Sequence, residues 1–314
     1  MFFYKLYSLT VVSDLELPDA ECSKLHTLVG NSDVAITLCS VSQDFLKDEK
    51  LVTINDEWCY LASDPQLFYM RYLGFAFEVS NGCSIKVDTQ GQDVTNTKLA
   101  TFILGSAFGV IGMQRGFIPI HGTAIATGND ACIITGFVGS GKSAILGSLI
   151  NKGFKYLADD VSMIVVDNGN PYVLPSYPQR KIAASTLDEI GESVSGALSL
   201  VESGKEKYAI RRTFEWLDKK LPLSCIVELV PEARENEPGF TPEVRRITGH
   251  ASLKLVLRNQ YRPHFVAKIG TPPERMKRLL DITSSVNTFQ LIRPVTGFPV
   301  NETARMIIET CFPE

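Results

Sequence analysis

The sequence has no hydrophobic run long enough to cross a membrane. Its longest uncharged apolar stretch, Leu99 to Gln114, is bounded by Lys98 and Arg115. That stretch is shorter than the about 20 residues that a membrane helix needs. The N-terminus also lacks the basic start, apolar run and small-residue cleavage site of a secretion signal. These absences favour neither a membrane-spanning helix nor a secretion signal, and the cysteines described next predict a cytoplasmic protein.

Paired cysteines are lacking as well. The chain of 314 residues has seven cysteines, an odd number, with no Cys-x-x-Cys pair and no histidine nearby at metal-ligand spacing. Scattered cysteines of odd number are typical of a reducing compartment rather than of a disulfide framework. The spacing therefore predicts no structural zinc site. The seven positions are Cys22, Cys39, Cys59, Cys83, Cys132, Cys225 and Cys311.

An excess of positive charge is also missing. The formal net charge is −4 at pH 7, so the chain as a whole has no broad electrostatic attraction for DNA, RNA or an anionic membrane. We therefore expect neither a nucleic acid nor a membrane among its partners.

The first 95 residues differ in pattern from the rest of the chain. They contain short β-rich runs separated by turn signals, spaced as in a small antiparallel sheet. Residues 91–96 predict a joint between a β-rich domain, 1–95, and a second domain, 96–314. The fold class predicted from this pattern is α+β. The strands predicted in the first domain are Lys5–Val12, Asp33–Val41, Leu51–Leu61, Phe68–Val79 and Ser84–Asp88.

The second domain is predicted to alternate apolar strands with helices. Periodicity and turn signals place its elements only coarsely. The predicted strands are Ile120–Thr127, Ala131–Thr135, Tyr156–Leu157 and Val161–Val166. The predicted helices are Leu99–Arg115, Ala184–Gly191, Ala251–Leu257, Pro273–Ile282 and Asn301–Cys311.

Residues 136–143 carry the strongest chemical pattern, a glycine followed by four free positions and then Gly-Lys-Ser. A predicted strand precedes this segment and a predicted helix follows it, as a phosphate-binding loop requires. Glycines allow backbone N–H groups to turn onto phosphate oxygens, and the helix N-terminus adds its positive dipole. The alternative is a glycine-rich turn that caps an ordinary helix. The residues expected to bind nucleotide phosphates are Gly136, Val138, Gly139, Ser140, Gly141, Lys142 and Ser143.

Within this phosphate loop two side chains have specific expected roles. Lys142 can reach the β- and γ-phosphates, and the Ser143 hydroxyl is the expected Mg²⁺ ligand. ATP and Mg²⁺ are therefore the expected cofactors.

Asp159 and Asp160 follow a predicted strand shortly after the loop. Two carboxylates there can divide the work of phosphoryl transfer, one binding the metal and the other accepting the proton of the attacking hydroxyl. The alternative is a solvated turn whose Asp side chains cap the next element. His121 lies in an apolar run, where a lone histidine is more often a satisfied core residue than a site residue.

These segments resemble the catalytic domain of the HPr kinase/phosphorylase family. The resemblance is carried by Ile120-His121-Gly122, the phosphate loop and Leu157-Ala158-Asp159-Asp160, in that order, and is strong over about residues 118–165. It implies a phosphate-loop domain with a mixed central sheet, similar to that of phosphoenolpyruvate carboxykinase. Residues 174–182 resemble a segment of HPr-kinase-like proteins encoded beside peptide-modification genes, some of which phosphorylate the C-terminal serine of lasso-peptide precursors.

The resemblance implies a role for each matching residue. Asp159 would be the base that activates the acceptor hydroxyl, and Asp160 a metal or orienting ligand. His121 would lie next to the transferring group. A further cation is expected to neutralise the transferred phosphate, with Arg180 preferred because it lies in the family-like segment, although each candidate is more often a solvated surface charge. The other candidates are Lys181, Arg211 and Arg212.

The sequence also departs from the family. Ala144 stands where HPr kinase/phosphorylases have glutamate, and their second glycine-rich signature has no counterpart between residues 183 and 260. We therefore expect neither phosphorolysis nor HPr as the acceptor. The leading hypothesis is an ATP- and Mg²⁺-dependent kinase that phosphorylates a serine of a peptide, with a lasso-peptide precursor as the favoured substrate. The alternatives are a non-catalytic ATP-binding regulatory module, a small-molecule kinase and a metal-dependent NTPase. A homo-oligomer stays open, because the related family forms hexamers.

Overall fold

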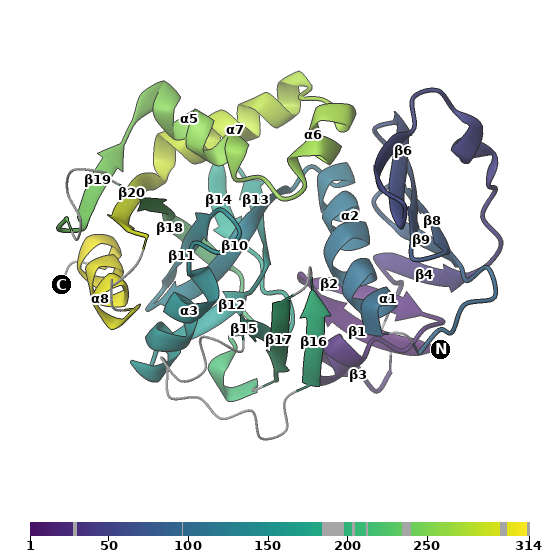
Figure 1. Ribbon diagram of the computed structural model, residues 1–314, viewed down its shortest axis with the longest axis horizontal. Coiled ribbons are helices and arrows are strands. Elements are labelled where there is room, and N and C mark those ends of the chain that lie inside the picture. The colour runs from purple at the N-terminus through teal and green to yellow at the C-terminus, as the bar shows by residue number, and fades with distance from the viewer. Residues whose placement is uncertain are drawn as a thin grey trace. The chain divides into compact units, whose positions relative to one another are not determined.

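The computed structural model describes residues 1–27, 30–95, 97–183, 198–202, 205–211, 213–233, 240–295 and 300–312, and has a mixed α+β architecture (Figure 1). Its contacts divide the chain into two compact units. The first comprises Met1–Pro119 and Arg262–Arg275, and the second comprises Ile120–Tyr261 and Met276–Glu314. The division differs from the predicted joint after residue 95, because the helical segment that follows the joint packs with the first unit.

The first unit is built on a nine-stranded sheet of order β3-β1-β2-β4-β9-β8-β7-β6-β5. The sheet was expected to be antiparallel, but β2 pairs parallel with β4 and β4 pairs parallel with β9, so it is mixed. Parallel neighbours need a long connection between them, and the segments from β2 to β4 and from β4 to β9 are long enough. The strands are β1 (Phe2–Leu6), β2 (Leu9–Ser13), β3 (Lys24–Leu25), β4 (Val34–Leu38), β5 (Val52–Asn55), β6 (Trp58–Asp64), β7 (Leu67–Tyr72), β8 (Phe75–Ser80) and β9 (Ser84–Asp88).

The predicted strands Lys5–Val12, Leu51–Leu61 and Phe68–Val79 are each a hairpin of two strands. The hairpin of β1 and β2 turns at Tyr7 and Ser8, with φ of 52° and 60°, and that of β7 and β8 turns at Leu73 and Gly74, with φ of 50° and 86°. Two consecutive positive φ angles are typical of tight two-residue hairpin turns. Neither pair is one of the Asn-Gly or Asp-Gly signals that identify such turns in a sequence, so the turns were missed.

The helices of the first unit pack on this sheet. The predicted helix Leu99–Arg115 is confirmed as one helical stretch, made of α1 (Thr97–Phe102), a π-helical segment (Ile103–Ala107) and α2 (Phe108–Gln114). Helix α6 (Pro263–Ile269) was not predicted, and its Phe265 ring lies 4.7 Å from that of Phe68 on β7. The short 3-10 turns Pro18–Ser23 and Asp44–Lys47 complete the unit.

The second unit contains a sheet of order β11-β10-β13-β14-β18-β20-β19, with β12 paired to β10. Strand β18 also pairs parallel with β11 and with β20, while β10 and β11 are antiparallel, which confirms a mixed sheet. A separate small sheet has the order β15-β17-β16. The strands are β10 (Ile118–Thr127), β11 (Asp130–Gly136), β12 (Lys155–Ala158), β13 (Val161–Asp167), β14 (Asn170–Val173), β15 (Arg180–Ala183), β16 (Leu198–Glu202), β17 (Lys205–Ile210), β18 (Leu221–Glu232), β19 (Glu243–Ile247) and β20 (Asn287–Pro294).

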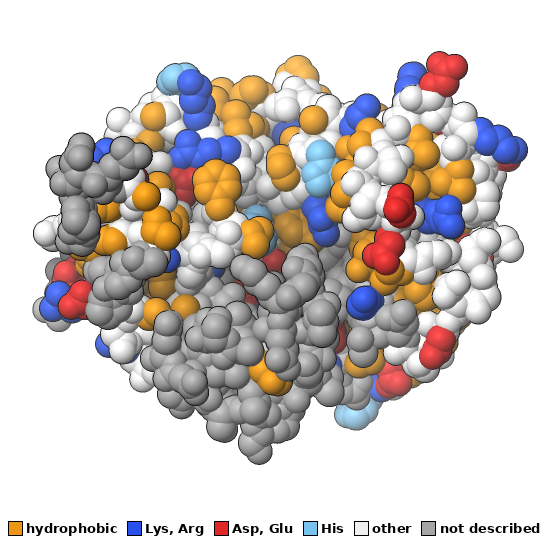
Figure 2. All heavy atoms as spheres, viewed as in Figure 1, with side chains coloured by type: hydrophobic (Ala, Val, Ile, Leu, Met, Phe, Trp, Pro, Cys, Tyr) orange, Lys and Arg blue, Asp and Glu red, His pale blue; other side chains and the backbone are white. Residues whose placement is uncertain are grey.

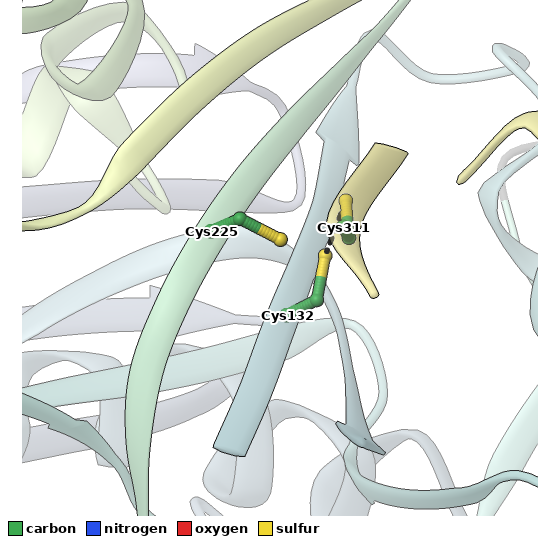
Figure 3. Close-up of side chains that lie close together, drawn as sticks. All are labelled: Cys132, Cys225 and Cys311. Atoms are coloured by element: carbon green, nitrogen blue, oxygen red, sulfur yellow. Dashed lines mark hydrogen bonds between the residues drawn. The ribbon is translucent and has the colours of Figure 1, made fainter. Parts of the chain in front are cut away.

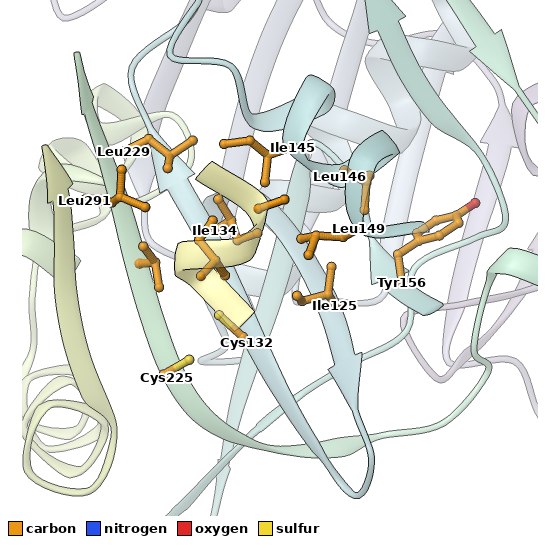
Figure 4. Close-up of a cluster of buried hydrophobic side chains, with 13 residues drawn as sticks. Ile125, Cys132, Ile134, Ile145, Leu146, Leu149, Tyr156, Cys225, Leu229 and Leu291 are labelled. Atoms are coloured by element: carbon orange, nitrogen blue, oxygen red, sulfur yellow. The ribbon is translucent and has the colours of Figure 1, made fainter. Parts of the chain in front are cut away.

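Helix α3 (Lys142–Asn151) is anchored on the sheet by its buried aliphatic face. Figure 4 shows Ile145, Leu146 and Leu149 directed toward Ile125 of β10 and Ile134 of β11. Burial of aliphatic side chains of this size is the main stabilising term of such an interface. The helix that follows the phosphate loop is therefore fixed to the strands that precede it.

The remaining helices confirm three predictions. The predicted helices Ala251–Leu257, Pro273–Ile282 and Asn301–Cys311 correspond to α5 (Gly249–Arg258), α7 (Pro273–Ser285) and α8 (Val300–Cys311). The 3-10 turn Thr213–Glu215 was not predicted. Helix α8 packs on α3 and contributes Ala304 and Ile307 to the same core. The predicted helix Ala184–Gly191 lies outside the described residues.

The described surface mixes all classes of side chain. On the face seen in Figure 2, basic and acidic side chains are interspersed with apolar ones. Among the described residues, no helix combines the length and apolar character needed to cross a membrane.

Candidate functional site

The phosphate loop connects β11 to α3, as its sequence pattern predicts. Gly136, Gly139 and Gly141 have φ of 141°, 86° and 98°, which are strained for any residue with a side chain. A Cβ at position 136 would lie 2.7 Å from the carbonyl oxygen of Leu229 on the neighbouring strand β18. Glycine is therefore required here both by the backbone angle and by the close approach of the two strands.

Two polar side chains, those of Lys142 and Ser140, lie within the loop. Lys142 Nζ donates hydrogen bonds to the carbonyl oxygens of Gly136 and Phe137, at 2.8 and 3.0 Å. The Ser140 hydroxyl is buried, and among the described residues it has no hydrogen-bond partner. Ser143 lies in the first turn of α3 and is partly exposed. An unsatisfied hydroxyl, a lysine and a glycine-lined helix N-terminus fit the phosphates and Mg²⁺ of a nucleotide.

Arg293 on β20 contacts the loop, and the sequence did not reveal it. Its Nη2 donates a hydrogen bond to the carbonyl oxygen of Ser140 at 2.8 Å, and it would lie 3.2 Å from a Cβ at Gly141. The sheet brings this guanidinium to the loop because β20 pairs with β18, which pairs with β11. The residue lies in no motif, so only the strand order could have identified it.

The two predicted carboxylates lie between β12 and β13. Asp159 Oδ1 accepts a hydrogen bond from the Asp160 N–H at 3.0 Å, and its Oδ2 accepts one from the Lys181 N–H at 2.8 Å. Burial raises the pKa of Asp159 above its ordinary value, an effect that the N–H of Lys181 opposes and the charge of Asp160 reinforces. A carboxylate with a raised pKa that stays partly exposed is suited to accept a proton.

The Asp160 carboxylate lies near two side chains that can carry positive charge, those of His121 and Lys181. The Asp160 backbone is left-handed, with φ of 70°, and its Oδ1 lies 3.5 Å from His121 Nδ1. Its Oδ2 lies 3.7 Å from Lys181 Nζ. At these distances the pairing is loose, since good ion-pair hydrogen bonds are shorter. His121 and Asp160, both predicted site residues, are therefore brought together, and Lys181 joins them.

Backbone and side-chain contacts place this acidic pair next to the phosphate loop. The Gly122 N–H donates to the Asp160 carbonyl oxygen at 3.2 Å, and Gly122 pairs with Thr135 across β10 and β11. Thr135 Oγ1 lies 2.7 Å from the carbonyl oxygen of His121, to which it donates. Thr135 is the last residue before Gly136, so the carboxylates and the loop meet at one edge of the sheet.

The preferred cation of the sequence, Arg180, has different surroundings. Its side chain is buried, and its Nε donates to Glu215 Oε2 at 3.0 Å. The Lys181 side chain approaches the acidic pair, and Arg211 Nε donates a hydrogen bond to Gln179 Oε1. A catalytic role for Arg180 stays a prediction, and Arg212 lies outside the described residues.

A second polar cluster lies on the other side of β11, and no motif predicted it. Glu228 on β18 pairs with Arg258 and accepts hydrogen bonds from Asn259 Nδ2 and Gln290 Nε2, at 2.8 and 2.7 Å. Burial acts to raise the pKa of Glu228, but the hydrogen bonds from these three side chains outweigh it and lower that pKa. Glu228 also lies in register with Thr135 on β11.

Comparison with known proteins adds a weak structural likeness. No family model matches the chain, and no curated protein matches it. Among solved structures, the Hpr(Ser) kinase/phosphatase from Coxiella burnetii is similar over 61% of this chain and 94% of that chain, with 12% sequence identity and a TM-score of 0.32. At this level the likeness carries no argument about function, which must come from the residues of the site.

Proposed function

We propose that the protein is an ATP- and Mg²⁺-dependent kinase that transfers the γ-phosphate to a hydroxyl group. The observation that supports this most strongly is the placement of Asp159 and Asp160 beside the phosphate loop, through the contacts of Gly122 and Thr135. A phosphate cradle next to a proton acceptor is what in-line phosphoryl transfer requires.

Each residue of the site has a chemical task in this proposal. The loop amides and Lys142 hold the phosphates, and Asp159 takes the proton of the attacking hydroxyl. The new O–P bond forms as the bond between the γ-phosphorus and the bridging oxygen breaks, and ADP leaves. Mg²⁺, held by Ser143 and Asp160, would neutralise the charge on the phosphates. His121 and Lys181 hold the Asp160 carboxylate in place until the metal binds.

Arg293, which reaches the loop from β20, is proposed to add positive charge next to the phosphates. Its guanidinium contacts the Ser140 carbonyl oxygen, so a small rotation would direct it to phosphate oxygens. Arginine is well suited to this task because its planar fork can contact two oxygens at once. It replaces Arg180 as the preferred phosphate-neutralising residue, because Arg180 is engaged with Glu215 in the interior.

The acceptor is proposed to be a serine of a peptide, and most specifically the C-terminal serine of a lasso-peptide precursor. The support is the resemblance of residues 174–182 to HPr-kinase-like proteins encoded beside peptide-modification genes. Lys181 belongs to that segment and contributes directly to the acidic pair.

Transfer from γ-labelled ATP tests the proposal. Purified protein is incubated with Mg²⁺, labelled ATP and either short peptides ending in serine, the same peptides ending in alanine, or hydroxyl-bearing metabolites. Label on the serine peptides alone is the expected result. Label on a metabolite alone would redirect the proposal to a small-molecule kinase, and release of free phosphate without an acceptor would contradict it in favour of an NTPase.

A non-catalytic ATP-binding module is the second candidate. The observation that favours it is the engagement of Asp160 by both His121 and Lys181, which would compete with a metal ion for the carboxylate. The same experiment separates the two functions, because a binding module would retain ATP in equilibrium dialysis and label no acceptor.

A further inference from the structure

Three cysteines that are far apart in the sequence meet in the second unit. Cys132 of β11 and Cys225 of β18 are register partners on neighbouring parallel strands, and Cys311 is the last residue of α8. Their sulfur atoms all lie within 4.8 Å of one another. Figure 3 shows the three side chains converging from these three elements. The sequence predicted no zinc site because it showed no cysteine pair, and this premise fails once the strands are paired.

The spacing of the sulfur atoms is close to that of a thiolate metal site. Two sulfurs that lie 2.3 Å from a zinc ion at a tetrahedral angle are about 3.8 Å apart. Cys132 Sγ and Cys311 Sγ are 3.8 Å apart. The other two separations are at most 4.8 Å, so closing them requires side-chain movements of less than about 1 Å.

The chemistry of the three ligands selects a soft cation. Thiolates favour zinc or copper(I) over the hard ions Mg²⁺ and Ca²⁺. Cys132 and Cys225 belong to a cluster of mainly apolar buried side chains that includes Leu149 and Ile307, and Cys311 and Phe154 pack against it. An apolar shell makes isolated thiolates costly, so a doubly charged ion offsets more of that cost than a singly charged one, which favours zinc.

The coordination sphere has room for a fourth ligand. Among the described residues, no histidine, carboxylate or further cysteine joins the three sulfurs. Cys132 and Cys225 are buried, whereas Cys311 is only partly buried. The remaining position would therefore be filled by water that enters beside Cys311. Three protein ligands and one water form an ordinary zinc coordination set.

We propose that Cys132, Cys225 and Cys311 bind one Zn²⁺ ion through their thiolates. Binding releases the thiol protons to solvent and involves no oxidation. The ion would join α8 to β11 and β18, the strands that lead to the phosphate loop and to Glu228, and so fix the C-terminal helix against α3. This site is separate from the proposed Mg²⁺ site and does not depend on the proposed kinase activity.

Metal content and cobalt spectroscopy test the proposal on the full chain. The reduced protein is purified without chelators, and zinc is measured per chain by mass spectrometry of the metal. The expected value is about one ion per chain. The apoprotein titrated with Co²⁺ should then develop a sulfur-to-cobalt charge-transfer band that saturates at the same ratio and disappears when Zn²⁺ is added.

Variants locate the ligands. Cys311→Ser, the change least damaging to the core, should lose the bound zinc and most of the cobalt band. The double variant Cys39→Ser with Cys83→Ser is the matched control, because both cysteines are exposed and free, and it should retain both signals. Zinc should raise the thermal midpoint of the wild-type chain by about 4 °C or more and leave that of Cys311→Ser unchanged.

The measurements on wild-type protein can contradict the proposal by themselves, so the test does not depend on whether the variants fold. Wild-type protein that binds no zinc and gives no cobalt charge-transfer band would show that the cysteines are ordinary core residues. A chain that is two hydrogens lighter after purification under reducing conditions, with the label of a thiol reagent missing at Cys132 and Cys311, would indicate a disulfide and contradict a metal site. A cobalt band unchanged in Cys311→Ser would also contradict it.

Discussion

Two acidic clusters flank the strand that leads into the phosphate loop, and they are held in opposite ways. On the β10 side, the Asp160 side chain is 35% exposed, and among the described residues it lies 3.5 Å from His121 Nδ1 and 3.7 Å from Lys181 Nζ. On the β18 side, the Glu228 side chain is 2% exposed and is hydrogen-bonded by Arg258, Asn259 and Gln290. A loosely paired, accessible carboxylate can change partners, whereas a buried and satisfied one cannot do so cheaply.

Under the proposed function the two clusters have different tasks. In the proposed kinase the Asp159–Asp160 pair takes part in the chemistry, since its present contacts can be exchanged for a metal ion and a substrate proton. The Glu228 cluster instead connects β18 to β11. Asn259 Nδ2 donates a hydrogen bond to Glu228 on β18, and Asn259 Oδ1 accepts one from Thr135 on β11. Changes in the first cluster should therefore affect turnover, and changes in the second should affect stability.

The largest expected effect belongs to Lys142→Ala, in the loop between the two clusters. Removing the ammonium group should lower phosphoryl transfer by about 1,000-fold or more and weaken ATP binding, because in the proposed function this group holds the phosphates. ATP-dependent thermal stabilisation and γ-label transfer give the two readouts. Lys152→Ala, at the exposed C-terminal end of the same helix, is the matched control and should behave as wild type.

Asp159→Asn is expected to have the next largest effect and separates binding from chemistry. Loss of the general base should lower the transfer rate by about 100- to 10,000-fold, while ATP binding stays within a few-fold of wild type. Asp167→Asn is the control, since Asp167 is exposed at the end of β13 and pairs only with Lys220 among the described residues. Equal transfer rates for Asp159→Asn and wild type would remove the distinction between the two clusters.

Glu228→Gln should show the reverse pattern. We expect a loss of about 2 kcal/mol in the free energy of unfolding, because charged hydrogen bonds in the interior are removed. The transfer rate of the folded protein should change little by comparison with Asp159→Asn. Urea unfolding measures the loss, and Glu309→Gln, which removes an exposed pair with Arg305, should cost about 0.5 kcal/mol or less. A stable but inactive Glu228→Gln protein would place Glu228 in the chemistry.

The two clusters should also respond to pH with opposite signs, and this is the smallest effect. The folded pKa of Glu228 lies below its ordinary value of 4.5, so its contribution to stability is present above pH 4.5 and is lost as the pH falls through the folded pKa. The folded pKa of Asp159 lies above its ordinary value of 3.8, so stability falls as the pH rises from 3.8 through the folded pKa. Urea midpoints of wild type, Glu228→Gln and Asp159→Asn against pH resolve the two contributions. A Glu228→Gln profile parallel to that of wild type would refute the first.

Transfer should follow the ionisation of Asp159 as well. The base acts only without its proton, so the rate should rise with pH through a pKa above the ordinary value for aspartate. Measured at pH values where the protein stays folded, a rate that falls over this range would argue against Asp159 as the base.

How much the sequence predicted depends on the distance over which each feature is encoded. The phosphate loop, the acidic pair and His121 are local motifs, and neighbouring strands bring them together. Arg293, Glu228 and the pair Cys132 and Cys225 needed the parallel pairing of β11 with β18 and of β18 with β20, whose register partners are 93 and 62 residues apart in the sequence. No short-range pattern records such pairing.

Two hairpin turns of the first unit were also not predicted from the sequence. Its strands were placed correctly in outline, but Tyr7-Ser8 and Leu73-Gly74 carry hairpin turns without a strong turn signal. The backbone angles there are imposed by the pairing of the flanking strands. Local composition could therefore identify a β-rich segment and could not resolve where each strand reverses.

A crystal structure with Mg²⁺ and a non-hydrolysable ATP analogue tests the proposed kinase most directly. We expect the phosphates on the loop amides, with Lys142 Nζ moved from the carbonyl oxygens of Gly136 and Phe137 onto phosphate oxygens. We also expect an Asp159 carboxylate oxygen within about 6 Å of the γ-phosphorus, the reach of a base acting through one hydroxyl. Phosphates bound elsewhere, or an Asp159 carboxylate well beyond that reach, would rule out the proposed kinase mechanism.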